Sequence, residues 1–178
     1  MVLCNALPFF VSMMSISTQT SDPLTQFACA FSALIHDVDH YGVTNNQLMK
    51  EKVRIAGQYQ RSIAEQNSLV LAWDLLLDPD FDDFRSCLCS DQVELSRFRQ
   101  IVVNCVMATD IVDKELKKLR NNRWDKAFKE RKEDDNVHDA TNRKATIVLE
   151  HLIQASDVSH TMQHWHVYRK WVSSQKVV

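Results

Sequence analysis

Glycine and proline are too scarce in this chain for a fold that depends on tight turns. The 178 residues include only two glycines and three prolines. Hairpins and short turns between strands draw heavily on these residues, because they supply the unusual backbone angles that such turns need. The scarcity therefore predicts a mostly helical, all-α architecture. A chain of this length needs only one hydrophobic core, and nothing in it demands a second domain.

Apolar residues recur three and four positions apart, which predicts about six helices. The first begins with Asp22 as N-cap and Pro23 at the first helical position. Its apolar face is expected to hold Phe27, Phe31, Leu34, Ile35 and Val38.

The remaining helices follow from capping and stop signals. Thr44 and Gln47 have the spacing of a capping box, and so do Ser62 and Glu65. From about Asp91, one long helix is expected, with a buried stripe that runs through Leu95, Phe98, Val102, Cys105, Thr109, Val112, Leu116 and Leu119. An exposed, charged connection is expected over 121–139, a fifth helix over 143–156 and a sixth from 160 onward.

Charge and cysteine content narrow the function classes. The 21 basic and 23 acidic residues argue against a non-specific nucleic-acid binder, which would have a basic surplus. The five cysteines are odd in number and lie mostly in apolar runs, which indicates free thiols in a reducing compartment and so a cytoplasmic location. The apolar N-terminal residues have no basic start and lack the length of a membrane span.

The stretch HDVDH crowds His36, Asp37, Asp39 and His40 at the end of an apolar, helix-like segment. It could be the polar face of an amphipathic helix or part of a metal site. On a helix, adjacent side chains point about 100° apart, so His36 and Asp37 could approach one metal only from one rim, and a third ligand must come from a distant segment. His36 and His40 would lie one turn apart.

Three other polar residues stand out in apolar surroundings. Glu65 could simply complete the capping box with Ser62. Thr109 interrupts an apolar stripe, and its hydroxyl could bond back to the carbonyl of Cys105. Asp157 ends an apolar helix, where a carboxylate opposes the helix dipole and a nearby cation would be favourable. For the remaining histidines near the C-terminus, packing or surface placement is the simpler interpretation: His160, His164 and His166.

Four motifs, HDVDHYGVTNN, SIAEQN, MATD and QASDVSH, occur in an order and spacing that resemble the catalytic domain of the 3',5'-cyclic-nucleotide phosphodiesterases. The resemblance runs from about Ser21 to Trp171. It leaves 1–20 as an unmatched segment and 21–178 as a partial domain. It implies an incomplete HD-type helical bundle around a two-metal pocket, with Zn²⁺ in one site and Mg²⁺ or Mn²⁺ in the other.

The resemblance also implies roles for individual residues. His36, Asp37 and Asp157 are similar to the family's metal ligands, with Asp37 bridging both ions. His40, Glu65 and Thr109 are similar to the catalytic residues around the waters of the second metal. The implied reaction is metal-assisted hydrolysis of cyclic AMP or cyclic GMP to the 5'-monophosphate.

The chain departs from the family pattern in three places. No histidine precedes His36, whereas the family takes its general acid from an upstream HNxxHA motif. The family's nucleotide-binding glutamine and phenylalanine lie downstream of the last matched motif. The usual His-His after the glutamate is replaced, here at Asn67 and Ser68. We therefore expect a truncated form with weak or no turnover.

Two alternatives remain open at the level of the sequence. One is another HD-type metal-dependent phosphohydrolase. The other is a non-catalytic helical interaction module that retains the old ligands. Exposed apolar faces, such as that of Phe27 and Phe31, could also support an oligomer. The sequence does not distinguish cyclic AMP from cyclic GMP.

Overall fold

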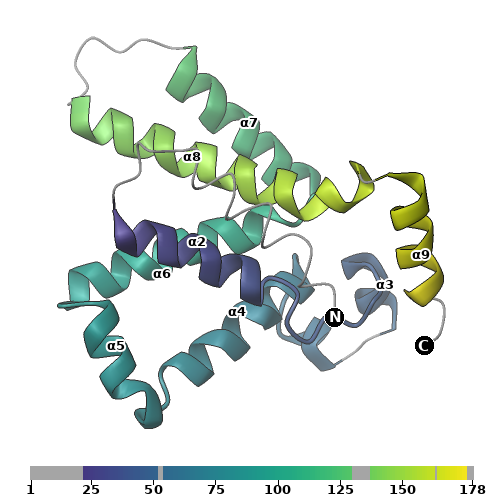
Figure 1. Cartoon of the computed structure of the whole chain (residues 1–178), viewed down its shortest axis with the longest axis horizontal. Helices are drawn as coiled ribbons and strands as arrows, with labels where there is room; N and C mark the ends of the chain where they lie inside the picture. The colour runs from purple at the N-terminus through teal and green to yellow at the C-terminus, as the bar shows by residue number, and fades with distance from the viewer. Residues whose placement is uncertain (1–21, 52–53, 130–136, 163, 176–178) are drawn as a thin grey trace.

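The computed structural model describes residues 22–51, 54–129, 137–162 and 164–175, which form helices and no strands (Figure 1). The all-α prediction is confirmed. The α-helices are α2 (Pro23–Ile35), α3 (Asn45–Lys50), α4 (Ile63–Leu76), α5 (Asp82–Leu88), α6 (Gln92–Ala108), α7 (Lys114–Phe128), α8 (Val137–Val158) and α9 (Trp165–Gln175). Three short 3₁₀ helices cover Arg54–Gly57, Pro79–Phe81 and Ser159–Met162.

Helices α2, α6 and α8 form the centre of the bundle. α2 packs along α6, α6 packs against α8, and α7 runs antiparallel to α8 on the other side (Figure 1). α4 and α5 extend from the lower side of α2 and α6 in this view, and α9 follows α8 at the far end. Among the helices so described, none is both long and apolar enough to span a membrane.

Aromatic side chains join three of these helices. Phe98 of α6 is fully buried, and its ring centroid lies 5.9 Å from that of Phe27 and 5.7 Å from that of Phe31. Trp73 of α4 meets Phe98 edge-on at 5.9 Å. These separations lie within the range where aromatic pairs attract each other beyond their area of contact. Phe98 is therefore the residue that ties α2 and α4 to α6.

The buried face of α2 agrees only in part with the predicted one: Ile35 is buried and Phe27 and Phe31 pack against the core, as expected. Ala28 and Cys29 are fully buried, whereas Leu34 and Val38 are exposed. Small side chains let the backbones of α2 and α6 approach closely, so the core includes the small residues beside Phe27 and Phe31 instead of Leu34. The helix also ends at Ile35, with His36 as C-cap. The expectation that two histidines stack one helical turn apart is therefore wrong.

The long helix predicted from Asp91 is also wrong in its extent. α6 ends at Ala108, and a new helix begins after Asp113, whose side chain accepts hydrogen bonds from the backbone N–H groups of Glu115 and Leu116. This N-cap satisfies donors that a continuous helix would have paired with carbonyls. Val112 and Leu119, which were assigned to the buried stripe, are exposed.

Several local predictions are confirmed. Asp22 and Thr44 each accept a hydrogen bond from a backbone N–H in the first turn of the following helix, although the Gln47 side chain donates to Glu51 and does not complete the capping box. The helix expected from about Asp91 begins at Gln92, with Asp91 as its N-cap. The four cysteines within the described residues are free thiols: Cys29, Cys87, Cys89 and Cys105. Cys4 lies outside the described residues.

Candidate metal site and adjoining pocket

His36 lies at the C-terminal end of α2 with its imidazole ring buried. Its Nδ1 atom is 3.0 Å from the carbonyl oxygen of Ala33, so Nδ1 donates a hydrogen bond, and in the neutral ring the other nitrogen, Nε2, carries the lone pair. Nε2 is 3.5 Å from Oδ2 of Asp37 and 3.3 Å from Oδ1 of Asp157. Neither contact has hydrogen-bond geometry, so Nε2 is a buried polar atom without a hydrogen-bond partner among the described residues.

These spacings suit ligands of a shared cation. Two donors about 2.0–2.2 Å from a tetrahedral zinc ion lie about 3.4 Å from each other. A metal-ligating histidine also typically donates its second ring nitrogen to a carbonyl, as His36 does to Ala33. Within the described part of the chain, however, no group of three His, Cys, Asp or Glu side chains is already arranged to hold a metal ion. Binding would therefore require side-chain adjustment around His36.

The charges around His36 also favour a bound cation. Burial lowers the pKa of His36, but the contact with the Asp157 carboxylate and the negative charges of Asp37 and Asp157 outweigh burial and raise the pKa above its usual value. Two carboxylates turned toward one imidazole favour a cation at this position, either a proton or a metal ion. A metal ion would have to displace the proton.

The loop after His36 is held by the first turns of α4. Asp39 has a positive φ of 58°, an uncommon conformation that aspartate tolerates better than most residues. Asn67 Nδ2 donates to Asp39 Oδ2 at 3.1 Å, and Ser68 Oγ donates to the carbonyl oxygen of Val38 at 2.8 Å. The two residues that replace the family's His-His therefore fix the loop. The sequence marked these positions as unusual and assigned them no role.

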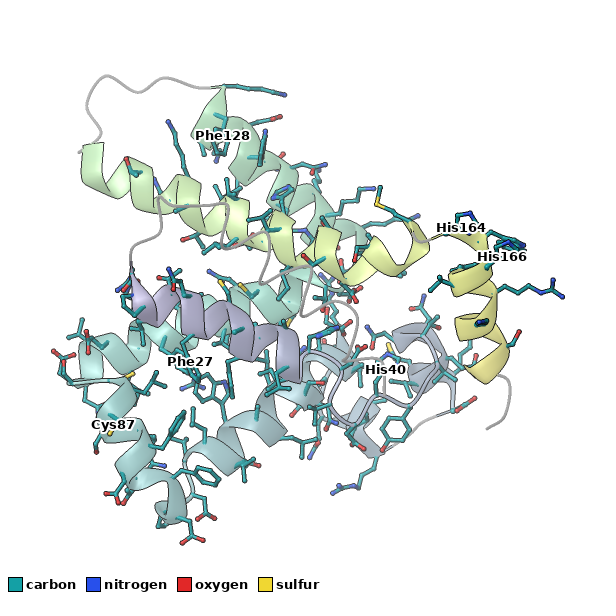
Figure 2. All side chains as sticks on the ribbon, viewed as in Figure 1. Phe27, His40, Cys87, Phe128, His164 and His166 are labelled. Atoms are coloured by element: carbon teal, nitrogen blue, oxygen red, sulfur yellow. The ribbon has the colours of Figure 1, made fainter. Side chains whose placement is uncertain are left out.

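A pocket of about 670 Å³ opens beside this loop. Its wall is formed by the loop before α3, the start of α4 and the turn between α6 and α7. The three predicted catalytic residues His40, Glu65 and Thr109 all line it. Figure 2 shows the exposed His40 on the side of the molecule where α3 lies. The metal-ligand candidates His36, Asp37 and Asp157 are not among the lining residues.

Glu65 projects from the first turn of α4, and the expected capping box is wrong. Ser62 has a positive φ of 43° and makes no side-chain cap; its hydroxyl donates to Asp110 Oδ2 at 2.7 Å. Glu65 instead accepts a hydrogen bond from Asn45 Nδ2 at 2.9 Å. Burial is the main cause that raises the pKa of Glu65; the Asp110 charge adds to it, while Asn45 and His40 oppose it.

Asp110, the last residue of the MATD motif, was given no role by the sequence analysis. It is 5% exposed and directly follows Thr109. Its Oδ2 accepts hydrogen bonds from Ser62 Oγ and, at 3.3 Å, from Asn45 Nδ2, and its carbonyl oxygen accepts one from Arg120 Nη2 at 3.3 Å. Asp110 thus joins the α6–α7 turn to the starts of α3 and α4. Its place next to Thr109 was visible in the sequence, but its hydrogen-bond partners are distant in sequence and could not be.

The hydroxyl of Thr109 donates to the carbonyl oxygen of Val106 at 2.7 Å, rather than to that of Cys105. The general expectation of a back-bonded threonine therefore holds with a different acceptor, because Thr109 is the C-cap of α6. His164 and His166 are exposed at the start of α9, with ring centroids 5.1 Å apart (Figure 2). The side chain of His160 lies outside the described residues.

Comparisons with known proteins agree with the sequence motifs. A family model described as 3'5'-cyclic nucleotide phosphodiesterase matches residues 3–175, and it begins inside the segment 1–20 that the motifs left unmatched. A relative from Caenorhabditis elegans, a probable 3',5'-cyclic-AMP phosphodiesterase, is 30% identical over 161 residues, 89% of this chain and 23% of the relative. A human dual specificity calcium/calmodulin-dependent 3',5'-cyclic nucleotide phosphodiesterase is 30% identical over 151 residues, 83% of this chain and 19% of the relative.

Solved structures agree on the fold. LmjPDEB1 in complex with IBMX superposes with a TM-score of 0.73 at 22% identity, over 97% of this chain and 50% of that structure. The phosphodiesterase domain of the RhoPDE fusion protein from Salpingoeca rosetta gives 0.74 at 21% identity, over 96% and 52%. The chain thus spans about half of these structures and less than a quarter of the two relatives.

Proposed function

Since the chain belongs to the 3'5'-cyclic nucleotide phosphodiesterase family, we propose that its helices form the metal-holding part of a site that hydrolyses cyclic AMP or cyclic GMP to the 5'-monophosphate. One observation is the main support. His36 and Asp157, far apart in sequence, approach within 3.3 Å, and the His36 atom concerned is a buried nitrogen without a hydrogen-bond partner among the described residues. Such an arrangement is costly unless a cation neutralises it.

In this proposal His36, Asp37 and Asp157 bind the metal ions. The donor set of one imidazole and two carboxylates suits Zn²⁺, and carboxylates also suit Mg²⁺ or Mn²⁺. Bound divalent ions would polarise the phosphate and supply a nucleophile at neutral pH. The carbonyl of Ala33 holds the imidazole in the tautomer that binding requires.

The pocket residues have a separate task. His40, Glu65 and Thr109 line the pocket, and we assign them to orienting the phosphate and its waters. The Asn45 hydrogen bond directs the Glu65 carboxylate, and a carboxyl group with a raised pKa can exchange a proton nearer to neutral pH. The proposed substrate is a cyclic nucleotide in the cytoplasm, and the proposed functional unit is the segment 21–178.

We propose that the chain by itself turns over substrate weakly or not at all. No histidine precedes His36, so the family's upstream general acid has no counterpart in this sequence. Loss of a positioned general acid typically lowers the rate by about 10²–10⁴-fold. The residues that hold metal and orient water would remain, so metal binding should persist where turnover does not.

Metal content tests this proposal directly. After incubation with zinc and dialysis, the wild-type chain should retain about one equivalent of metal, measured by mass spectrometry. Asp157→Ala should lose it, whereas Asp125→Ala, which removes a half-exposed acid on α7 paired with Lys129, should keep it. Cyclic AMP and cyclic GMP are then assayed with added Mn²⁺.

Four results would contradict parts of the proposal. Equal zinc in wild type and Asp157→Ala would remove the metal site. Full turnover by the isolated chain would remove the statement about weak activity. Hydrolysis of a different nucleotide phosphoester, with no effect on cyclic nucleotides, would favour another HD-type phosphohydrolase. A chain that binds no zinc and loses nothing on chelation would be a helical interaction module.

A further inference from the structure

Helix α4 is apolar on nearly all of its sides, although only one side is covered. Its inner side contributes Ile63, Ala64, Leu69, Ala72, Trp73 and Leu76 to the core. A helix that is hydrophobic all round is normally buried all round. The uncovered side of α4 therefore needs an explanation.

The uncovered side, here called the outer α4 face, consists of Val70, Leu71, Asp74, Leu75 and Leu77. All four apolar members are exposed, Leu75 by 61%. The spacings 70/74/77 and 71/75 place them on one surface. In Figure 1, α4 lies on the lower side of the bundle, next to α5. The outer α4 face is therefore a continuous apolar strip rather than a set of scattered residues.

Negative charge surrounds this strip. Between Ser62 and Phe84 the sequence has no lysine or arginine, whereas Asp74 lies on the face and Asp78 and Asp80 follow directly after it. The C-terminal end of α4 adds the negative end of its helix dipole. The first basic residue, Arg85, is already engaged: it donates to the carbonyl oxygens of Leu76 and Asp78 and pairs with Asp82.

We propose that the outer α4 face binds a basic amphipathic helix of a partner protein. Apolar side chains of such a helix would cover Leu71 and Leu75, and its lysines or arginines would meet Asp74 and the acidic end of α4. A second copy of this chain would bring Asp74 against Asp74, and an anionic membrane would be repelled. The inference does not depend on phosphodiesterase activity.

A synthetic probe tests the proposal. A fluorescent 18-residue helix of leucine and lysine, patterned to present one apolar stripe, is titrated with the full chain and followed by anisotropy. Leu75→Ser should weaken binding about tenfold, since it removes much of one buried leucine side chain. Leu119→Ser, at 57% exposure on α7, is the matched control and should leave binding unchanged.

A charge comparison completes the test. Asp74→Lys should weaken the leucine–lysine probe and strengthen a leucine–glutamate probe of the same pattern, and rising salt should weaken wild-type binding. Because both substituted side chains are exposed, the thermal midpoints should change little; if Leu75→Ser unfolds, Leu71→Gln replaces it. Equal binding of both probes, or equal loss in Leu75→Ser and Leu119→Ser, would overturn the proposal. Self-association of the wild-type chain in sedimentation, if Leu75→Ser abolished it, would also overturn the proposal.

Discussion

Replacement of Asp110 by asparagine is the sharpest test of how the pocket is held together. The carboxylate accepts four hydrogen bonds: from Ser62 Oγ at 2.7 Å, from Asn45 Nδ2 at 3.3 Å, and from the backbone N–H groups of Val112 and Asp113 at 3.1 Å each. Asp110 itself is buried, and it links the α6–α7 turn to the starts of α3 and α4. Removing its charge should therefore affect the stability of the whole chain.

The magnitude follows from the hydrogen bonds. Asparagine keeps the size of Asp110, and its carbonyl oxygen can still accept from Val112 and Asp113. Its NH₂ group, however, would replace Oδ2, which accepts from both Ser62 and Asn45. The Ser62 hydroxyl can turn and accept instead, but the Asn45 NH₂ group would face a second donor, so one charge-assisted hydrogen bond is lost. Hydrogen bonds to a charged group are worth about 1.5–3 kcal/mol, and we expect a loss of about 2 kcal/mol in the free energy of unfolding.

The assay is urea unfolding at neutral pH, followed by tryptophan fluorescence, because Trp73 is buried in the core. A loss of about 2 kcal/mol corresponds to about 4–8 °C in the melting temperature of a chain of this size. Asp125→Asn is the control, since Asp125 on α7 contacts Lys129 near the surface, and it should cost less than about 1 kcal/mol. If Asp110→Asn costs no more than Asp125→Asn, the structural role given to Asp110 is wrong.

Three further predictions concern stability. Phe98→Ala, at the fully buried centre of the aromatic cluster, should lower the free energy of unfolding by about 3–5 kcal/mol; a loss below about 1 kcal/mol in urea unfolding would contradict this packing. Ser68→Ala leaves the Val38 carbonyl without its donor and should lower the free energy of unfolding by about 1–3 kcal/mol. Ser86→Ala is the control: the exposed Ser86 hydroxyl also donates to a carbonyl, and its removal should cost less. Equal melting temperatures of the two variants would refute this difference. Glu150 is buried beside Arg123, and burial raises the pKa of Glu150 above its ordinary value of 4.5 despite that arginine. In the window above pH 4.5 the folded chain then binds more protons than the unfolded chain, so stability falls as pH rises through it. Glu150→Gln has no carboxyl group to titrate, so its free energy of unfolding relative to wild type should increase between pH 4 and 7. A difference that stays constant with pH in urea unfolding would contradict this prediction.

Local chemistry was readable from the sequence where a feature depends on residues a few positions apart. Asp22 was identified as an N-cap because a short acidic side chain reaches N–H groups in the next turn without help from the rest of the fold. The scarcity of glycine and proline predicted the helical class because tight turns also depend on the residue types at a few neighbouring positions. The family motifs, read in order, led to the residues that the structure brings together around His36.

Tertiary structure decided the features that depend on distant partners. Ser62 and Glu65 have the spacing of a capping box, yet Ser62 bonds to Asp110 and Glu65 to Asn45. The stripe that ends at Leu119 has helical periodicity throughout, but the Asp113 cap and the turn at Asp110 divide it into two helices. Periodicity records only local spacing, whereas each of these hydrogen bonds forms because folding brings distant segments together. Likewise, only the fold could show that Asp157 comes within 3.3 Å of His36.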